Sequence, residues 1–198
     1  MFRILTVCTA NICRSVMAAT QLETMFAHMD VADSLSVGSR GVRAQDGYSA
    51  CPIGFDFVEL SVPAHESARL DLASVAEADF ILTAEAQHRG AVVTMLPKAR
   101  SRVFTMNEAA ALTHWYLAQI RAGAPLPIPP ATADPDERLR WWISELNDSR
   151  GAAPIADLDI GDPHMVVRGP DTHEVTTHNI AEAMTAVVSG FTFALSPR

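Results

Sequence analysis

The first fifteen residues constrain the fold of this chain more than any other stretch. Residues 2–7 form a short apolar run with β-branched side chains and no helical stripe, which is typical of a buried strand. The run leads directly into Cys8-Thr9-Ala10-Asn11-Ile12-Cys13-Arg14-Ser15. A helix is predicted next, because apolar residues recur at i+3/i+4 spacing, at Ala18, Leu22, Met25, Phe26 and Met29. The sequence therefore predicts a loop between a strand end and a helix start.

Such a loop is suited to binding an oxyanion. Backbone N–H groups at a helix N-terminus point toward one spot, where the helix dipole adds partial positive charge. This environment should stabilise negative charge on the sulfur of Cys8. The thiolate can then attack phosphorus to give a phosphocysteine, while Arg14 holds two phosphate oxygens and Ser15 assists the departing sulfur. The alternative is that Cys8 is only a small buried hydrophobe.

The rest of the chain alternates between strand-like and helix-like segments. Strands are expected at 34–38, 78–83 and 102–105, and helices near 52–60 and 84–95; a polar loop containing Gly38, Gly41 and Gly47 follows the second strand. Alternation of this kind is typical of a parallel sheet covered by helices on both faces. We therefore expect an α/β three-layer sandwich with a central four-stranded parallel sheet.

A proline-rich stretch interrupts this pattern before the last helix. Residues 123–136 carry five prolines in fourteen positions and cannot form regular helix or strand. A short amphipathic helix is expected at 136–148. We interpret 123–156 as an insertion within one domain spanning 1–198, because too little chain follows to build a second core. A final helix is predicted from the apolar stripe of Ile180, Met184, Val187, Val188, Phe191 and Leu195.

A phosphatase reaction also needs an acid to protonate the leaving group. Three candidates, Asp157, Asp159 and Asp162, lie close together before the last helix. Asp162 precedes Pro163, which biases it toward an extended backbone in a rigid loop. A carboxylate held near the loop at Cys8 can act as general acid and then as general base for water. From spacing alone, three solvated loop aspartates remain an equal alternative.

Composition excludes several classes of protein. A net charge of −8 argues against nucleic-acid binding through a broad basic face. Three cysteines without a C-x2-C pair argue against a disulfide scaffold or a zinc ribbon, so no metal or cofactor is expected. We predict neither a signal peptide nor a membrane span, and a cytoplasmic location fits best.

The motifs together resemble the low-molecular-weight protein tyrosine phosphatases. The family pattern V-C-x-G-N-I-C-R-S-P is similar to residues 7–16, and its Asp-Pro pair is similar to 162–163. Further similarities lie at 36–39, 65–70 and 76–82, in the same order along the chain. The chain is identified as an actinobacterial-like member with an extended loop before Asp-Pro. The resemblance implies a metal-independent phosphatase acting through a phosphocysteine, with protein phosphotyrosine as substrate.

The resemblance also assigns roles to individual residues. It implies Cys8 as nucleophile, Arg14 as transition-state clamp and Asp162 as general acid and base. It implies that Asn11 holds the loop in a strained form, with Ser39 and His65 as its partners. Cys13 is implied to form a reversible disulfide with Cys8, with simple packing as the alternative. The implied substrate-binding set is Thr9, Ala10, Asn11, Ile12, Cys13, Ser15 and Arg40.

Three departures from the family pattern affect what is expected. Val16 replaces a proline in the first helical turn, where proline is favoured but not required. Ala10 replaces a glycine, which is acceptable if its φ is negative. His164 replaces the aromatic residue that follows Asp-Pro, which weakens the inference of phosphotyrosine preference.

Two other functions remain compatible with these residues. An arsenate reductase could use the same loop with an external small thiol, since 76–100 contain no further cysteine for a thioredoxin-coupled version. A non-catalytic phosphate-binding or partner-binding protein is the second. As partners we expect a phosphoprotein substrate, with a tyrosine kinase as a candidate, no nucleic acid, no membrane, and a monomer or weak dimer.

Overall fold

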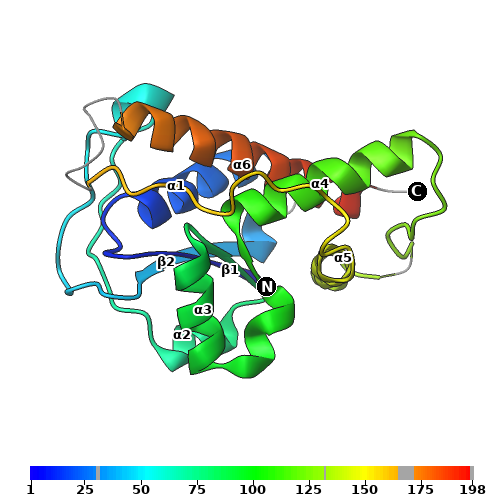
Figure 1. The fold of residues 1–198 in the computed structure, drawn as a ribbon, viewed down its shortest axis with the longest axis horizontal. Helices are drawn as coiled ribbons and strands as arrows, with labels where there is room; N and C mark the ends of the chain where they lie inside the picture. The colour runs from blue at the N-terminus through cyan, green and yellow to red at the C-terminus, as the bar shows by residue number, and fades with distance from the viewer. Residues whose placement is uncertain (30–31, 132, 165–171, 197–198) are drawn as a thin grey trace.

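The four predicted parallel strands form one sheet in the computed structural model, which describes residues 1–29, 32–131, 133–164 and 172–196 (Figure 1). The strands are β1 (Phe2–Cys8), β2 (Leu35–Gly41), β3 (Phe80–Thr83) and β4 (Val103–Thr105). Their order is β2-β1-β3-β4, and every neighbouring pair is parallel. The predicted α/β class and parallel sheet are confirmed.

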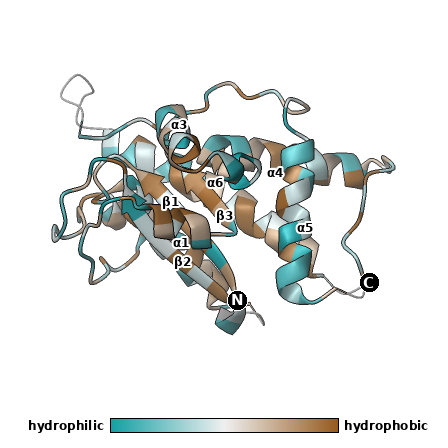
Figure 2. Ribbon diagram, turned by 90° about the horizontal axis from the view of Figure 1, so that it is seen from below, coloured by the Kyte–Doolittle hydropathy of each residue, from teal (hydrophilic) through white to brown (hydrophobic). Residues whose placement is uncertain are grey.

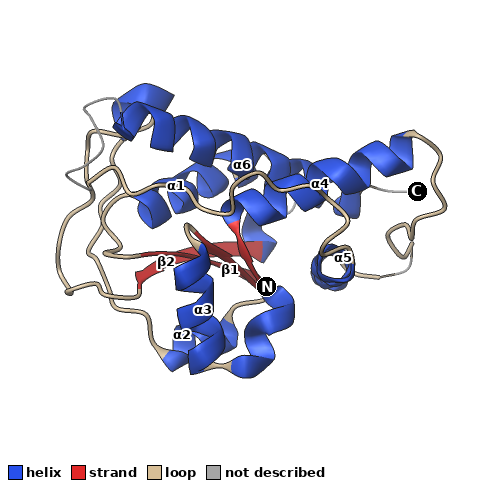
Figure 3. Cartoon of the chain, in the orientation of Figure 1, coloured by secondary structure: helices blue, strands red, loops and turns tan. Residues whose placement is uncertain are grey.

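Helices cover both faces of the sheet, which gives the three expected layers (Figure 3). One face packs against α1 (Arg14–Phe26), α4 (Met106–Arg121) and α6 (Thr172–Leu195), and α2 (Leu72–Glu77) and α3 (Ala86–Met95) lie on the other. Along β1, Phe2 and Ile4 enter the larger core while Leu5 and Val7 enter the smaller one. Burial on both sides explains the continuous apolar run, and the central strands are hydrophobic in Figure 2.

The second strand and the segment after it differ from the sequence prediction. β2 continues to Gly41, so Gly38 and Gly41 lie within the strand and not in a loop. The helix expected at 52–60 is only a 3-10 helix, η2 (Phe55–Val58), which ends where Glu59 adopts a left-handed φ of 53°. Further short 3-10 helices are η1 (Ala32–Ser34) and η3 (Pro97–Arg102).

Helix boundaries were predicted less well than helix positions. α1 ends at Phe26, so Met29 lies beyond it. α4 was not predicted, although Thr105 and Glu108 form a reciprocal capping box at its start, which was a readable signal. α6 has 24 residues, and it buries Ile180, Met184, Val187 and Phe191 of the expected stripe, whereas Val188 and Leu195 are partly buried. Among the described residues, no helix combines the length and apolarity needed to cross a membrane.

The insertion at 123–156 contributes to the core at the end of β1 that lies away from Cys8. Its helix α5 (Pro135–Asp148) begins with a capping box formed by Asp134 and Glu137. Trp142 is fully buried, contacts Gly190 of α6 and meets Tyr116 of α4 edge-to-face at 5.1 Å. The Met1 ammonium pairs with Asp136, which places the start of α5 beside the first residue of the chain. The helix of the insertion is thus remote from the loop at Cys8.

Candidate active site

The loop between β1 and α1 closes around the sulfur of Cys8. Cys8 is the last residue of β1, and Arg14 is the first of α1. The Asn11 N–H donates to Cys8 Sγ at 3.3 Å, and Ser15 Oγ lies 3.1 Å from the same sulfur. Asn11 has a left-handed φ of 55°, whereas Ala10 does not, which satisfies the condition under which alanine is acceptable there.

Asn11 holds the loop in this form through its side chain. Its Nδ2 donates to Ser39 Oγ at 2.8 Å and to Ser15 Oγ at 3.1 Å, and its Oδ1 accepts from the Ala68 N–H at 2.8 Å. His65 Nε2 lies 2.7 Å from the Asn11 carbonyl oxygen. The structure therefore brings together the three residues that the sequence predicted as a supporting set, Asn11, Ser39 and His65.

The end of β2 supports the loop by close backbone approach. A Cβ at Gly41 would lie 2.7 Å from the Asn11 nitrogen, and 2.8 Å from the Ala10 carbonyl carbon and the Thr9 oxygen. Arg43 N–H donates to the same Thr9 oxygen at 2.8 Å. Glycine is required at 41 because backbone atoms, which cannot rotate away as a side chain can, occupy the space.

Arg14 is 1% exposed and is surrounded by acceptors. Its Nη2 donates to Asp162 at 2.7 Å and to Thr9 Oγ1 at 3.1 Å, and its Nη1 donates to the Ile160 carbonyl at 2.8 Å and to Glu85. Asp162, the general acid that the resemblance implied, thus reaches the loop, although it lies 148 positions from Arg14 in the sequence. Burial raises the pKa of Glu85, but hydrogen bonds from Arg14 and Gln87 outweigh it and lower the pKa overall.

Sequence reasoning missed Glu85 and His88. Glu85 follows β3 at the same edge of the sheet as Cys8, a signal that the parallel topology offered. His88 is buried, and its Nε2 lies 3.0 Å from Thr9 Oγ1. Burial lowers the pKa of His88, partly opposed by the charge of Glu85. The sequence gave no signal that this lone histidine, within a predicted helix, would contact Thr9.

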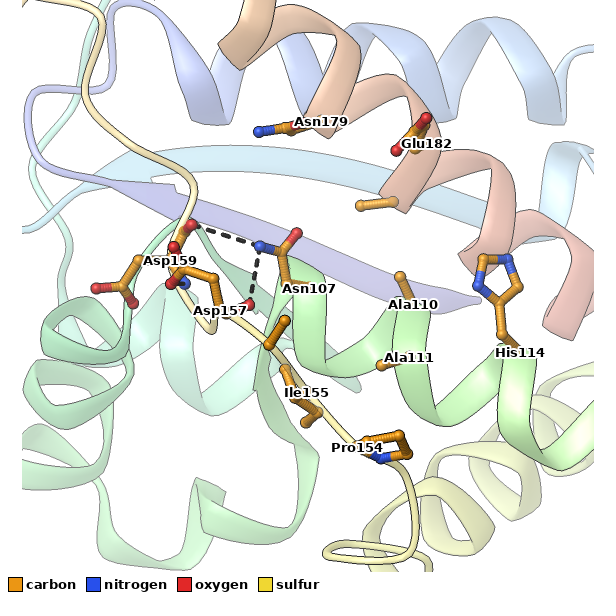
Figure 4. Close-up of a pocket in the computed structure, with 12 residues that line it drawn as sticks. Asn107, Ala110, Ala111, His114, Pro154, Ile155, Asp157, Asp159, Asn179 and Glu182 are labelled. Atoms are coloured by element: carbon orange, nitrogen blue, oxygen red, sulfur yellow. Dashed lines mark hydrogen bonds between the residues drawn. The ribbon is translucent and has the colours of Figure 1, made fainter. Parts of the chain in front are cut away.

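Asp157 and Asp159 have other contacts. Asn107 Nδ2 donates to their backbone carbonyls at 3.1 and 3.4 Å, and Asp159 Oδ1 accepts from the Ala86 N–H at 2.7 Å. Both line a separate hollow of about 370 Å³ between α4 and α6, together with His114 (Figure 4). Of the three aspartates, only Asp162 contacts Arg14 among the described residues.

Arg40 does not lie in the polar loop that was expected after a strand at 34–38. It is part of β2, where it donates to the Ser39 carbonyl at 2.8 Å, and it lines a shallow depression with Ser36 and Glu77. Since successive strand residues point to opposite faces, Arg40 faces away from the side on which Ser39 meets Asn11. This position gives no support to the substrate-binding role that the resemblance implied for Arg40.

The remaining predicted residues line the loop. Ile12 is half-buried, and its carbonyl accepts from the Cys51 N–H at 2.8 Å. Cys13 is buried with a free thiol, as are Cys8 and Cys51. Burial raises the pKa of the Cys13 thiol, and the neighbouring Cys51 and Cys8 raise it further. The disulfide between Cys8 and Cys13 stays a prediction.

The chain is similar in sequence to known phosphatases. Residues 3–118 match the family described as "Low molecular weight phosphotyrosine protein phosphatase". The chain is 31% identical over 147 residues to "Protein-arginine-phosphatase" of Geobacillus stearothermophilus, covering 73% of this chain and 95% of that one. It is 31% identical over 116 residues to "Low molecular weight protein-tyrosine-phosphatase Wzb" of Salmonella typhi, covering 57% and 70%.

Solved structures show the same fold. The YwlE arginine phosphatase from Geobacillus stearothermophilus superimposes with a TM-score of 0.62 at 22% identity, covering 96% of this chain and 92% of that one. The tyrosine phosphatase amsI of Erwinia amylovora gives a TM-score of 0.63 at 20% identity, covering 94% and 91%.

Proposed function

Because the chain belongs to the low molecular weight phosphotyrosine protein phosphatase family and is a hydrolase of that family, we propose that it hydrolyses phosphomonoesters through a phosphocysteine at Cys8. No metal takes part in the reaction. The proposal rests mainly on the surroundings of Cys8 Sγ, which receives hydrogen bonds at a helix N-terminus. Beside it, Arg14 donates a hydrogen bond to Asp162 at 2.7 Å.

The first step transfers the phosphoryl group to sulfur. The Cys8 thiolate attacks phosphorus, the bond from phosphorus to the ester oxygen breaks, and that oxygen takes a proton from Asp162. The dianion replaces Asp162 and Thr9 as acceptors for Arg14 Nη2, so that the planar guanidinium holds two equatorial oxygens. This exchange also releases the Asp162 carboxyl to face the leaving group.

The second step removes the phosphoryl group from sulfur. Asp162 takes a proton from water as the water oxygen attacks phosphorus, and the S–P bond breaks. The departing thiolate is stabilised by the Ser15 hydroxyl at 3.1 Å and the Asn11 N–H at 3.3 Å. Inorganic phosphate leaves and the thiolate is regenerated.

We infer that Ile12, in the loop after Cys8, favours phosphotyrosine in a protein as the substrate. The two curated relatives are named for different substrates, arginine and tyrosine phosphate. A phosphoarginine guanidinium carries N–H donors beside phosphorus and needs acceptors, because unpaired buried donors are costly. The Ile12 side chain offers none because it is apolar, and one lone pair of its carbonyl oxygen is already used by the Cys51 N–H. A phenyl ring, by contrast, can pack against it.

The test uses reduced protein and two peptides of one sequence, carrying phosphotyrosine or phosphoarginine. We expect vanadate-sensitive turnover without added metal, abolished in Cys8→Ser, and a higher kcat/KM for phosphotyrosine. Ile12→Thr should narrow that preference, while Ile12→Val should keep it. No turnover of either peptide or of para-nitrophenyl phosphate would refute the catalytic proposal. A wild-type preference for phosphoarginine would refute only the substrate.

A further inference from the structure

Four potential metal ligands meet beside the proposed active site. They are Cys13, Cys51, His164 and His173, and their sulfur and nitrogen donor atoms all lie within 4.8 Å of one another. They come from four separate places: the residue before α1, the loop after β2, the residue following Asp162-Pro163, and the first turn of α6. The distances between these four residues along the sequence do not match a zinc-binding motif.

The donor set and its spacing fit a tetrahedral ion. Two thiolates and two imidazoles are a common structural zinc set, with bonds of about 2.3 Å to sulfur and about 2.0–2.1 Å to nitrogen. Neighbouring donors around such an ion lie roughly 3.3–3.8 Å apart by that geometry. Cys51 Sγ and His173 Nε2 already lie 3.7 Å apart. The rings of His164 and His173 meet edge-to-face at 4.7 Å between centroids, so their nitrogens can converge.

The chain around three of these ligands is already anchored. The Cys51 N–H donates to the Ile12 carbonyl at 2.8 Å, which fixes the cysteine loop to the phosphate loop. The His164 N–H donates to Asp162 Oδ1 at 3.0 Å, and Thr172 Oγ1 donates to the Pro163 carbonyl at 3.1 Å. The chain at Cys51, at His164 and next to His173 is thus fixed by contacts that do not depend on a metal. Preformed geometry of this kind lowers the cost of binding.

We propose that Cys13, Cys51, His164 and His173 bind one divalent transition metal ion, with zinc as the ion that suits the site. Binding converts two thiols to thiolates, and the two protons go to solvent. Four protein ligands leave no open position, so the ion is structural and does not activate water. It joins the phosphate loop, through Cys13, to the segment that carries Asp162, through His164 two residues later.

This assignment changes the meaning of two sequence features. His164, which replaces the family's usual aromatic residue, becomes a ligand. Cys13 bound to a metal cannot also form a disulfide with Cys8, so the ion and the reversible disulfide exclude each other. No metal was expected because the sequence lacks a contiguous cysteine motif. Folding brings these four ligands together from distant positions in the sequence.

The experiment is a cobalt titration of the full-length, metal-free, chemically reduced protein. Tetrahedral cobalt bound by thiolates gives visible d–d bands and near-ultraviolet charge-transfer bands, and zinc should abolish both at one equivalent. In Cys51→Ser and His173→Asn we expect affinity losses larger than the roughly 10–100-fold that removal of an outer partner costs. The control is His178→Asn, an exposed histidine on the same helix that should bind cobalt as the wild type does.

Circular dichroism shows whether each variant has folded. The proposal is overturned if wild type gives no thiolate-to-cobalt bands, if both ligand variants keep wild-type affinity, or if Cys13 and Cys51 form a disulfide that persists when metal and reductant are supplied together. The readout is metal binding, so it stands whether or not the proposed hydrolysis is observed.

Discussion

The two ends of β1 are built from different chemistry. At the Cys8 end the buried side chains include the polar Asn11, Arg14 and Ser15; Asn11 donates to Ser15, and Arg14 donates to Thr9. At the Phe2 end the contacts are aromatic, with Phe2 and Phe191 meeting edge-to-face at 5.7 Å. The comparison indicates that one end supplies reactivity and the other supplies stability. Substitutions at each end should therefore change one property and spare the other.

Asp162 is the residue at which we expect a substitution to separate activity from stability most strongly. In Asp162→Asn the general acid is lost, so kcat on a phenyl phosphate ester should fall by about 10²–10⁴. Asp159→Asn is the matched control, because Asp159 contacts the Ala86 N–H and not Arg14. Steady-state kinetics and thermal unfolding check both variants. A greater loss of kcat in Asp159→Asn would show that the wrong carboxylate was chosen.

For Trp142 in α5 we expect the opposite result, a loss of stability with little change in activity. Trp142→Ala removes a fully buried ring that contacts Gly190 and Tyr116, which should lower the free energy of unfolding by about 3–5 kcal/mol. Because the residue is remote from Cys8, kcat of the folded variant should stay within about twofold. Trp141→Ala, at a partly buried position, should cost less. Urea unfolding and kinetics at low temperature test this, and a large fall in kcat would contradict the separation.

Gly41 is the position where the two properties should not separate. Gly41→Ala places a Cβ 2.7 Å from the Asn11 nitrogen, so either the strand or the phosphate loop must shift. Overpacking of this kind costs about 1–3 kcal/mol, and the loop displacement should also reduce kcat/KM. Gly38→Ala in the same strand is the control, because its nearest neighbour is Leu5 Cδ1 at 4.0 Å. Equal behaviour of the two variants would mean that the close approach is not needed.

The same contrast explains what the sequence could reveal. The strand, loop and helix at 2–26 were predictable because the pattern and the chemistry are contiguous. Asp162 was found through its proline, and Asn11 with its partners through family resemblance. Glu85, His88 and the group around Cys51 were missed, because parallel strands and the return of α6 bring them together from distant positions. Arg40 was misplaced because the predicted strand ended at residue 38, three residues before the end of β2. The alternation of side-chain directions along the strand was therefore not applied to Arg40.

The smallest expected effect is a pH dependence of stability at His88, which is 1% exposed. Burial lowers its pKa in the folded state, with Arg14 acting in the same direction and Glu85 opposing. Above about pH 6.5 the imidazole is neutral in both states and the stability is fully present. As pH falls below that value, the unfolded chain binds a proton that the folded chain refuses, so stability falls.

His88→Gln removes this proton linkage at the polar end of β1. The free energy of unfolding in urea, measured from neutral to mildly acidic pH, should fall less steeply for the variant than for the wild type. His114→Gln, at an exposed histidine of α4, should follow the wild-type slope. Parallel slopes for wild type and His88→Gln would mean that the buried ring can take a proton at no cost. The polar end would then be less isolated from solvent than its burial indicates.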